Sequence, residues 1–190
     1  MSMSLRQRIC TGALFAALAL LGACSSMPPA LPGRLDLKLA PAALGTSIAV
    51  QQHLKVEREG RTDDLDAALE IDGEHIELVG LALGQRVLTL NYNGKELTSW
   101  RHALLPSQVR AEDVLEDLQL TLWPVEAIRA ALPPGWRIEE DGLHRSLYQG
   151  DEQVAAITYS GMPRWSGKTV LENRRYRYRL TVLSVATDTN

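Results

Sequence analysis

The sequence feature that most constrains the fold is an alternation of apolar and polar side chains with a period of two. In "SIAVQQHLKVER" (47–58), the apolar residues from Ile48 to Val56 share one parity and the charged residues mostly share the other. The same alternation recurs in "DDLDAALEID" (63–72). Successive side chains of a strand point to opposite faces, so this pattern predicts strands that are buried on one side only.

Turn signals separate these stretches from further strands. Asp72-Gly73 precedes "HIELVGLAL" (75–83), and Asn93-Gly94 interrupts "QRVLTLNYNGKEL" (85–97). Such dipeptides favour tight hairpins, so the first half of the domain is predicted to be an antiparallel meander. Strand patterns return in the second half of the domain, at residues 136–141, 143–149, 152–160, 167–172 and 175–185. The turn signals among them are Asp141-Gly142, Gly150-Asp151 and Gly161-Met162-Pro163.

Helical spacing interrupts the strands once, in "RAEDVLEDLQLTLW" (110–123). Its apolar residues recur every three or four positions, and acidic residues crowd its first turns, where the helix dipole favours anions. Pro124 then favours the start of a second helix at 125–132. Both helices must bury an apolar stripe. We therefore expect an α+β fold, in which a curved antiparallel sheet, or incomplete β-barrel, carries a helical lid on its concave face.

The first residues have the pattern of a secretory signal. Arg6 and Arg8 precede an uncharged run at 9–21, which is shorter than the roughly 20 residues that a membrane-spanning helix needs. The ending Leu21-Gly22-Ala23-Cys24 resembles a bacterial lipobox. This resemblance implies that residues 1–23 are removed and that Cys24 carries diacylglycerol and an acyl chain such as palmitate. The alternative is a secreted protein with an incidental cysteine.

The mature chain is predicted to be a tether followed by one domain. Residues 24–34 comprise the acylated cysteine and a stretch rich in Ser, Pro and Gly, and residues 35–190 form a single domain without a disulfide. Removal of the signal leaves 18 basic residues against 23 acidic ones, which does not favour nucleic acid as a partner. No aspartate follows Cys24, which resembles the default sorting to the periplasmic face of the outer membrane.

Three long stretches carry a resemblance to a known family. They are "LALGQRVLTLNYNGKEL", "VLEDLQLTLWPVEAIRAALPPGW" and "VAAITYSGMPRWSGKTVLENRRYRYRLTVLS". With the lipobox, they resemble the bacterial lipoproteins called domain of unknown function 3261, over nearly the whole mature chain. What is known of that family implies genes close to those for aryl polyene lipids.

The order of these stretches is more distantly similar to the order of the corresponding motifs in the LolA/LolB lipoprotein carriers. That similarity implies an incomplete barrel, a helical lid and an apolar cavity for acyl chains. No stretch of this chain was matched to the exposed-leucine loop with which the LolB receptor inserts lipoproteins into the membrane.

Together these patterns lead to a functional expectation. We expect an outer-membrane-anchored lipoprotein that accepts a hydrophobic ligand, namely a lipid, an aryl polyene lipid or an acylated protein, for delivery to that membrane. No cofactor is expected. The candidate residues for lining the cavity are Leu88, Leu90, Leu118, Leu122, Trp123, Ile128 and Trp136. The alternative is a non-catalytic module that holds an envelope exporter or assembly complex at the membrane.

Catalytic and metal motifs are absent from the sequence. The histidines His53, His75, His102 and His144 are scattered, and no serine lies in a Gly-x-Ser-x-Gly elbow. We therefore expect neither an enzyme nor a metal site, although folding could assemble a hydrolase site that spacing does not reveal.

Three sets of residues allow two interpretations each. Asp113 and Asp117 could bind a cation or share a proton, but a solvated helix face is the more ordinary role. Arg175, Arg177 and Arg179 either bind an anion or form a strand ladder opposed by acids. The tryptophans either pack in the core or line the cavity: Trp100, Trp123, Trp136 and Trp165.

Overall fold

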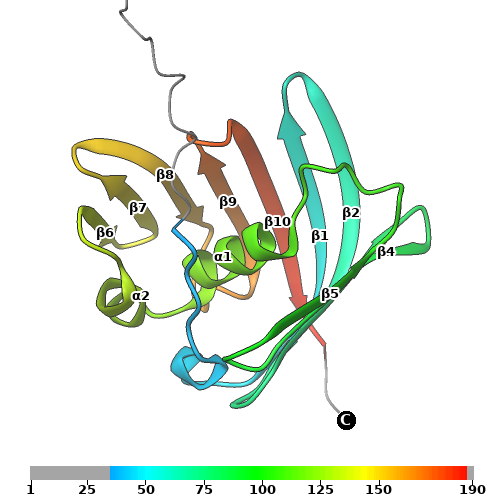
Figure 1. Ribbon diagram of the computed structural model, residues 1–190, viewed down its shortest axis with the longest axis horizontal. Coiled ribbons are helices and arrows are strands. Elements are labelled where there is room, and N and C mark those ends of the chain that lie inside the picture. The colour runs from blue at the N-terminus through cyan, green and yellow to red at the C-terminus, as the bar shows by residue number, and fades with distance from the viewer. Residues whose placement is uncertain (1–34, 188–190) are drawn as a thin grey trace, which may run out of the picture. The chain divides into compact units, whose positions relative to one another are not determined.

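A computed structural model describes residues 35–187, which belong to one compact unit of residues 34–190. Its main feature is a ten-stranded antiparallel sheet in the order β5-β4-β3-β2-β1-β10-β9-β8-β7-β6 (Figure 1). The strands β5 and β6 are the two edges and do not pair with each other, so the sheet is open. The predicted signal and lipidation site lie outside the described residues.

The strands fall into two meanders that meet in the middle of the sheet. The first comprises β1 (Ile48–Arg58), β2 (Arg61–Ile71), β3 (Ile76–Ala82), β4 (Gln85–Tyr92) and β5 (Leu97–Arg101). The second comprises β6 (Trp136–Asp141), β7 (His144–Gln149), β8 (Glu152–Tyr159), β9 (Gly167–Asn173) and β10 (Tyr178–Ala186). Pairing of β1 with β10 joins them, as in the partners Leu54 and Val182.

Between the meanders lie α1 (Ala111–Leu122) and α2 (Val125–Ala131). In Figure 1, α1 crosses in front of the central strands. The Tyr159 hydroxyl of β8 donates a hydrogen bond of 2.7 Å to the Thr121 carbonyl, so the carboxyl end of α1 packs on this face. We call this side of the sheet the inner face. Pro124 is the N-cap of α2, whereas the sequence predicts it at the first helical position, N1.

One hydrophobic core joins the helices to both meanders. Leu69, Ile76 and Leu90 from the first meander are fully buried, and so are Trp123 and Ile128 from the helical layer. Burying one such aliphatic side chain stabilises the folded state by about 1.5–3 kcal/mol. The alternation in the sequence predicts this inner face correctly, because Leu69 and Ile71 on β2 share the expected parity.

Because neighbouring strands run in opposite directions, the turns gather at two ends of the sheet. We call the upper end the one that carries the β1–β2, β3–β4, β7–β8 and β9–β10 turns, and the lower end the one that carries the others. The β1–β2 and β9–β10 turns lie at the top of Figure 1. The strand expected at 175–185 begins only at Tyr178. Residues 174–177 form the β9–β10 turn instead, since Tyr178 is the first residue to pair with β1 and β9.

Candidate functional site

The structure brings the seven predicted ligand-binding residues into one cluster. All of them belong to the hydrophobic core or pack against it. Five are buried and two are half-buried: Leu88, Leu90, Leu122, Trp123 and Ile128 in the first group, and Leu118 and Trp136 in the second. The predicted residues therefore do lie together, but as closely packed side chains.

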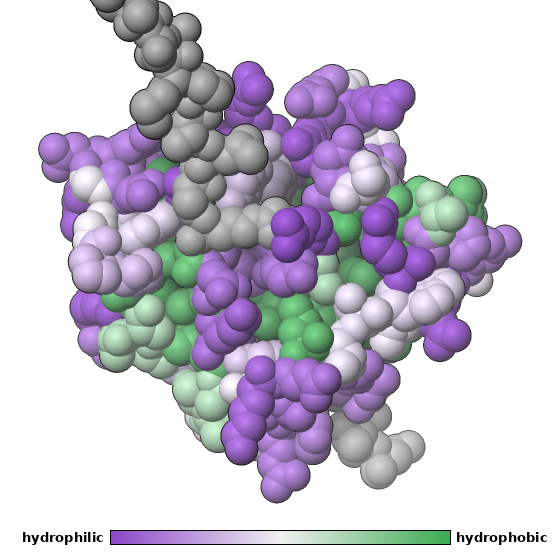
Figure 2. All heavy atoms as spheres, viewed as in Figure 1, coloured by the Kyte–Doolittle hydropathy of each residue, from purple (hydrophilic) through white to green (hydrophobic). Residues whose placement is uncertain are grey.

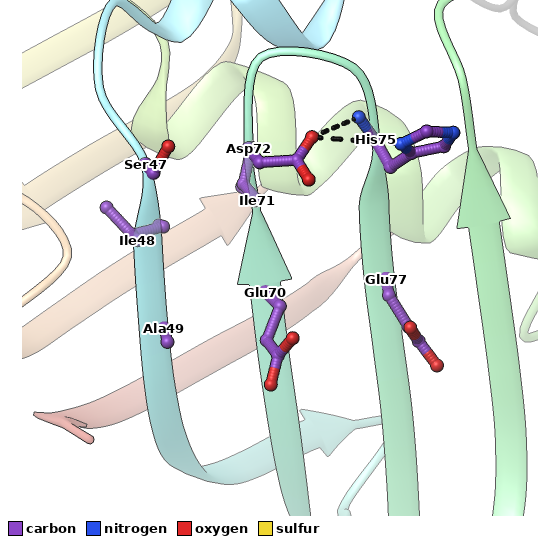
Figure 3. A pocket seen from close by; sticks show the side chains of 8 residues that line it. All are labelled: Ser47, Ile48, Ala49, Glu70, Ile71, Asp72, His75 and Glu77. Atoms are coloured by element: carbon purple, nitrogen blue, oxygen red, sulfur yellow. Dashed lines mark hydrogen bonds and ion pairs between the residues drawn. The ribbon is translucent and has the colours of Figure 1, made fainter. Parts of the chain in front are cut away.

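Two pockets among the described residues lie away from this cluster. The first has a volume of about 290 Å³ and lies at the lower end of β1, β2 and β3 (Figure 3). The carboxylate of Asp72 accepts the backbone N–H groups of Glu74 and His75 at 2.7 Å each, which lowers its pKa. Glu70 and Glu77 also line this pocket, so its polar character does not suit a hydrocarbon chain.

A strip of half-buried apolar side chains lies on the inner face, and the sequence analysis did not single it out. It comprises Leu54, Val56, Leu65, Leu180 and Val182, and we call it the apolar strip. The members are contiguous, because Leu54 pairs with Leu65 and Val182 while Val56 pairs with Leu180. Figure 2 shows hydrophobic residues reaching the surface in the middle of the face that α1 crosses. Parity places these side chains on the inner face, but only the tertiary structure shows that they are partly uncovered.

The carboxyl end of α1 is fixed by a buried ion-pair network. The Arg145 side chain on β7 is fully buried, pairs with Glu140 at 2.6 Å and donates a hydrogen bond to the Leu120 carbonyl. Arg164 pairs with the other oxygen of Glu140 at 2.5 Å. A cation at a helix carboxyl terminus is stabilising, and removing one member of a buried pair leaves an uncompensated charge. This end of α1 is therefore firmly attached to the sheet.

Near its middle, α1 contacts the sheet through a titratable group. The Tyr178 hydroxyl donates a hydrogen bond to the Asp117 carboxylate and accepts one of 3.2 Å from the Asn173 amide. The pKa of Asp117 is raised to about 7, chiefly by burial and in smaller part by the neighbouring Glu116 and Asp113, against the lowering effect of the Tyr178 hydrogen bond. The solvated helix face expected for Asp117 is therefore wrong. Its partner lies 61 residues away, which spacing along the helix does not reveal.

An extended segment at 35–40, which we call the strap, runs along α1. Its leucines Leu35, Leu37 and Leu39 are buried and alternate with exposed residues. The Gln119 side chain accepts the Leu39 N–H at 3.0 Å and donates to the Leu39 carbonyl at 2.9 Å.

Two further bonds hold the strap on either side of Gln119. The Glu116 carboxylate accepts the Asp36 N–H at 2.9 Å, and the Trp123 indole donates to the Ala40 carbonyl at 3.1 Å. The polar side chains recur at helical spacing, so one face of α1 holds the strap while the other packs on the sheet. Trp123 therefore has the core-packing role rather than that of a free cavity wall.

The β3–β4 turn at the upper end carries a fully exposed leucine. Leu83 has 100% of its surface accessible and a backbone φ of 51°, in the left-handed region that L-residues rarely adopt. Leu83 is thus a protruding leucine, and it is not among the site residues predicted from the sequence. The signal in the sequence is a leucine before Gly84 at a tight turn, where an apolar side chain cannot reach the core.

A protein metal site needs several ligating side chains in one group. Residues 35–187 contain no group of three or more His, Cys, Asp or Glu side chains that could hold an ion. They also contain no helix that is long and apolar enough to cross a membrane. His53 lies between two aspartates, 2.9 Å from Asp66 and 3.4 Å from Asp64, and the hydrogen bond that its ring donates to Asp66 is the main cause of its raised pKa.

Comparison with known proteins adds a family to this geometry. The model of the family described as protein of unknown function (DUF3261) matches residues 49–186. The chain belongs to this family. The DUF3261 match covers both helices and all ten strands apart from Ile48 at the start of β1, while the strap precedes it. No curated protein matches the chain in sequence.

Two solved structures are similar to this DUF3261 protein. One is a LolA superfamily protein from Nitrosomonas europaea, with 12% identity and a TM-score of 0.37, over 80% of this chain and 88% of that one. The other is a DUF1329 family protein from Desulfovibrio piger, with 12% identity and a TM-score of 0.35, over 76% of this chain and 87% of that one.

Proposed function

We propose that the protein is a lipoprotein, anchored at the periplasmic face of the outer membrane, that binds a hydrophobic ligand on the inner face of its sheet. The observation that carries this proposal is the apolar strip, where contiguous side chains such as Leu54 and Leu180 are only half-buried. A hydrocarbon chain that covers them gains about 0.8 kcal/mol for each methylene removed from water. The candidate ligands are a lipid, an aryl polyene lipid or an acylated protein.

In this proposal α1 acts as a lid with one fixed and one releasable end. The fixed end is the buried Arg145 network at the carboxyl terminus of α1. The releasable part is the contact of Asp117 with Tyr178, the residue that begins β10 beside the apolar strip. Breaking that contact would let α1 tilt away from the sheet, so that the apolar surface of the strip would extend toward the half-buried Leu118 on α1. Ligand transfer then needs no covalent chemistry, only two populations of α1 that bind the ligand differently.

Leu83 supports a role at the membrane. Its exposed side chain projects from the upper end of the sheet, and insertion into a bilayer would bury it. Burial of one leucine is worth about 1.5–3 kcal/mol, which is too little to anchor a protein but adds to the acyl chains predicted on Cys24. We therefore assign Leu83 to contact with the bilayer during delivery.

The experiment that tests ligand binding is titration of the purified protein with an apolar fluorescent dye, followed by displacement with phospholipid. Leu180→Gln puts a polar amide into the apolar strip and should weaken dye binding about tenfold. The matched control is Leu183→Gln, since Leu183 is on the same strand but on the outer face, where it is 47% exposed. Equal affinities of both variants and the parent protein would exclude the strip as the site.

The second candidate function is an interaction module without a ligand, which holds an exporter or assembly complex at the membrane. The closed packing around Trp123 and Ile128, both fully buried, favours it. Such a module would ignore the dye and would carry no lipid after purification. The same titration therefore separates the two functions.

A further inference from the structure

Arginines gather at the upper end of the sheet, in two adjacent turns. Arg58 and Arg61 flank the β1–β2 turn of Glu59 and Gly60, and three of the four residues of the β9–β10 turn are Arg174, Arg175 and Arg177. The turns are neighbours, because Arg58 is the register partner of Tyr178, the first residue of β10.

Most of these guanidinium groups form no ion pair with another residue in the range 35–187. Arg179 on β10 forms ion pairs with Glu172 at 3.3 Å and with Glu57 at 4.0 Å. Among the described residues, it is the member of the predicted arginine ladder that acidic side chains oppose. Arg175 is held by the Gln149 side chain at 2.9 Å. Arg174 and Arg177 are exposed, and among the described residues they form no ion pair.

These arginines border an open pocket with a volume of about 320 Å³. Its lining includes Arg174, Arg177 and Arg179, together with Tyr178 and the two glutamates that Arg179 engages. A guanidinium group presents a planar fork of donors that matches a phosphate oxygen pair. The pocket thus offers an unneutralised cationic wall on the surface of the upper end.

The lower end has the opposite character. Its β2–β3 turn carries Asp72 and Glu74, and its first pocket includes Glu70 and Glu77. Acidic side chains therefore predominate around the β2–β3 turn, whereas exposed cations predominate in the β9–β10 turn at the other end. A field of this kind orients a protein against a charged surface.

The strap begins near the upper end of the sheet. Glu116 holds Asp36, near the start of the strap, and the next residue, Asp117, holds Tyr178 at the upper end of β10. From Leu35 back to Cys24 there are eleven peptide steps, which span at most about 40 Å when extended. A lipid on Cys24 therefore keeps the upper end within reach of the bilayer.

We propose that the upper end is a docking surface for an anionic phospholipid bilayer, where Arg174 and Arg177 bind lipid phosphates. This inference rests on the lipid anchor of the proposed function, but not on ligand binding. Each arginine close to an anionic membrane contributes roughly a fivefold preference for the docked orientation, and the attraction declines with salt.

The test uses the lipidated full chain in vesicles of phosphatidylethanolamine with phosphatidylglycerol, doped with a lipid that carries a nitroxide on its headgroup. Fluorophores are attached to Thr62→Cys at the upper end or to Thr98→Cys at the lower end, both exposed threonines near a strand terminus. We expect strong quenching at position 62 and weak quenching at position 98. Quenching at position 62 should fall in phosphatidylcholine vesicles and at high salt.

Charge removal provides the matched comparison. Arg174→Gln combined with Arg177→Asn should reduce the ratio of docked to undocked protein by more than tenfold. Arg177 has a φ of 52°, which asparagine tolerates, so this change does not strain the turn. Lys95→Gln combined with Lys168→Gln removes the same charge from the lower end and should leave quenching unchanged.

Equal quenching at positions 62 and 98, or quenching at 62 that survives the arginine changes, would overturn the docking surface. Apolar-dye binding by the double arginine variant distinguishes this inference from the proposed function. Dye uptake that persists while docking is lost supports the inference. Normal docking by a protein that takes up no dye also supports it, and defeats only the ligand-binding proposal.

Discussion

The side chain of Asp117 links the position of α1 to pH. Its carboxylate ends a chain of hydrogen bonds that runs from the Asn173 amide through the Tyr178 hydroxyl. Because burial raises its pKa from 3.8 to about 7, the folded state binds a proton that the unfolded state has already released at intermediate pH. The stability contributed by this group is therefore present at low pH and declines as pH rises from about 4 to about 7.

Asp117→Asn should remove this pH dependence, because asparagine still accepts the Tyr178 hydrogen bond but does not titrate. The change in unfolding free energy between pH 5 and pH 8 should shrink by about 1–2 kcal/mol, measured by urea denaturation. Glu116, whose pKa burial also raises, leaves part of the dependence in place. Asp151→Asn in the exposed β7–β8 turn is the control. Parallel pH profiles for the parent protein and Asp117→Asn would contradict this account.

Leu83 makes opposite contributions to folding and to membrane contact. Leu83→Asn should keep the fold and stabilise it by up to about 1 kcal/mol, since asparagine tolerates the left-handed backbone at φ 51°. The same change should lower partitioning of the turn into vesicles by roughly tenfold, as expected for the loss of one buried leucine. Thermal denaturation and quenching of a probe on the turn measure the two effects. Lower stability with unchanged partitioning would show that Leu83 has a structural role instead.

The strap and α1 form one element in energetic terms. Gln119 satisfies both the N–H and the carbonyl of Leu39, a buried residue, so its removal leaves two backbone groups without partners. Each such group costs about 1–3 kcal/mol when it is buried and unsatisfied. The strap therefore restrains α1 from the side opposite the sheet.

Gln119→Ala should destabilise the protein by about 2–4 kcal/mol and accelerate amide hydrogen exchange in residues 36–40 more than in β1. The comparison variant is Gln153→Ala, which removes a side-chain hydrogen bond of 2.8 Å to Ser146 on the other side of the molecule. It should have a smaller effect and leave exchange in the strap unchanged. Uniform acceleration over the whole chain would indicate that the strap does not open separately.

The sequence predicts the positions of the strands and helices better than it predicts which of their side chains are covered by other parts of the chain. Parity and turn signals locate the strands and the inner face, because both depend on neighbouring residues. The start of β10 at Tyr178 was missed, since Tyr176 and Tyr178 share a parity although a turn includes only the first of them. The helical pattern predicts a solvated position for Asp117, because its hydrogen-bond partner Tyr178 belongs to β10, 61 residues away.

The candidate site was predicted only in part, for the same reason. The seven predicted residues do gather in one cluster, but only Leu118 and Trp136 among them are half-buried, and the apolar strip is formed by other residues, such as Leu54 and Val182. Whether an apolar side chain is covered depends on where α1 and the strap lie over the sheet. That placement rests on long-range contacts such as those of Gln119, which no local pattern contains.

For the whole molecule, the account combines an anchor, a basic end and an apolar inner face. The upper end carries the exposed Leu83 and the unpaired arginines of the β9–β10 turn, and the apolar strip lies below it on β1, β2 and β10. A ligand on the strip would thus lie close to the end of the domain that we propose to dock on the membrane. The proposed direction of delivery follows from this arrangement.

The central claim, that the inner face binds a hydrophobic ligand, is tested most directly by photocrosslinking. The purified protein is irradiated with a fatty acid that carries a diazirine on its chain, and the modified residues are identified by mass spectrometry. The account predicts adducts on the inner-face residues of β1 and β10, at positions 54–56 and 180–182, which excess phospholipid abolishes. Adducts confined to the outer face, such as at Leu183 and Val185, or no adduct that phospholipid displaces, would contradict it.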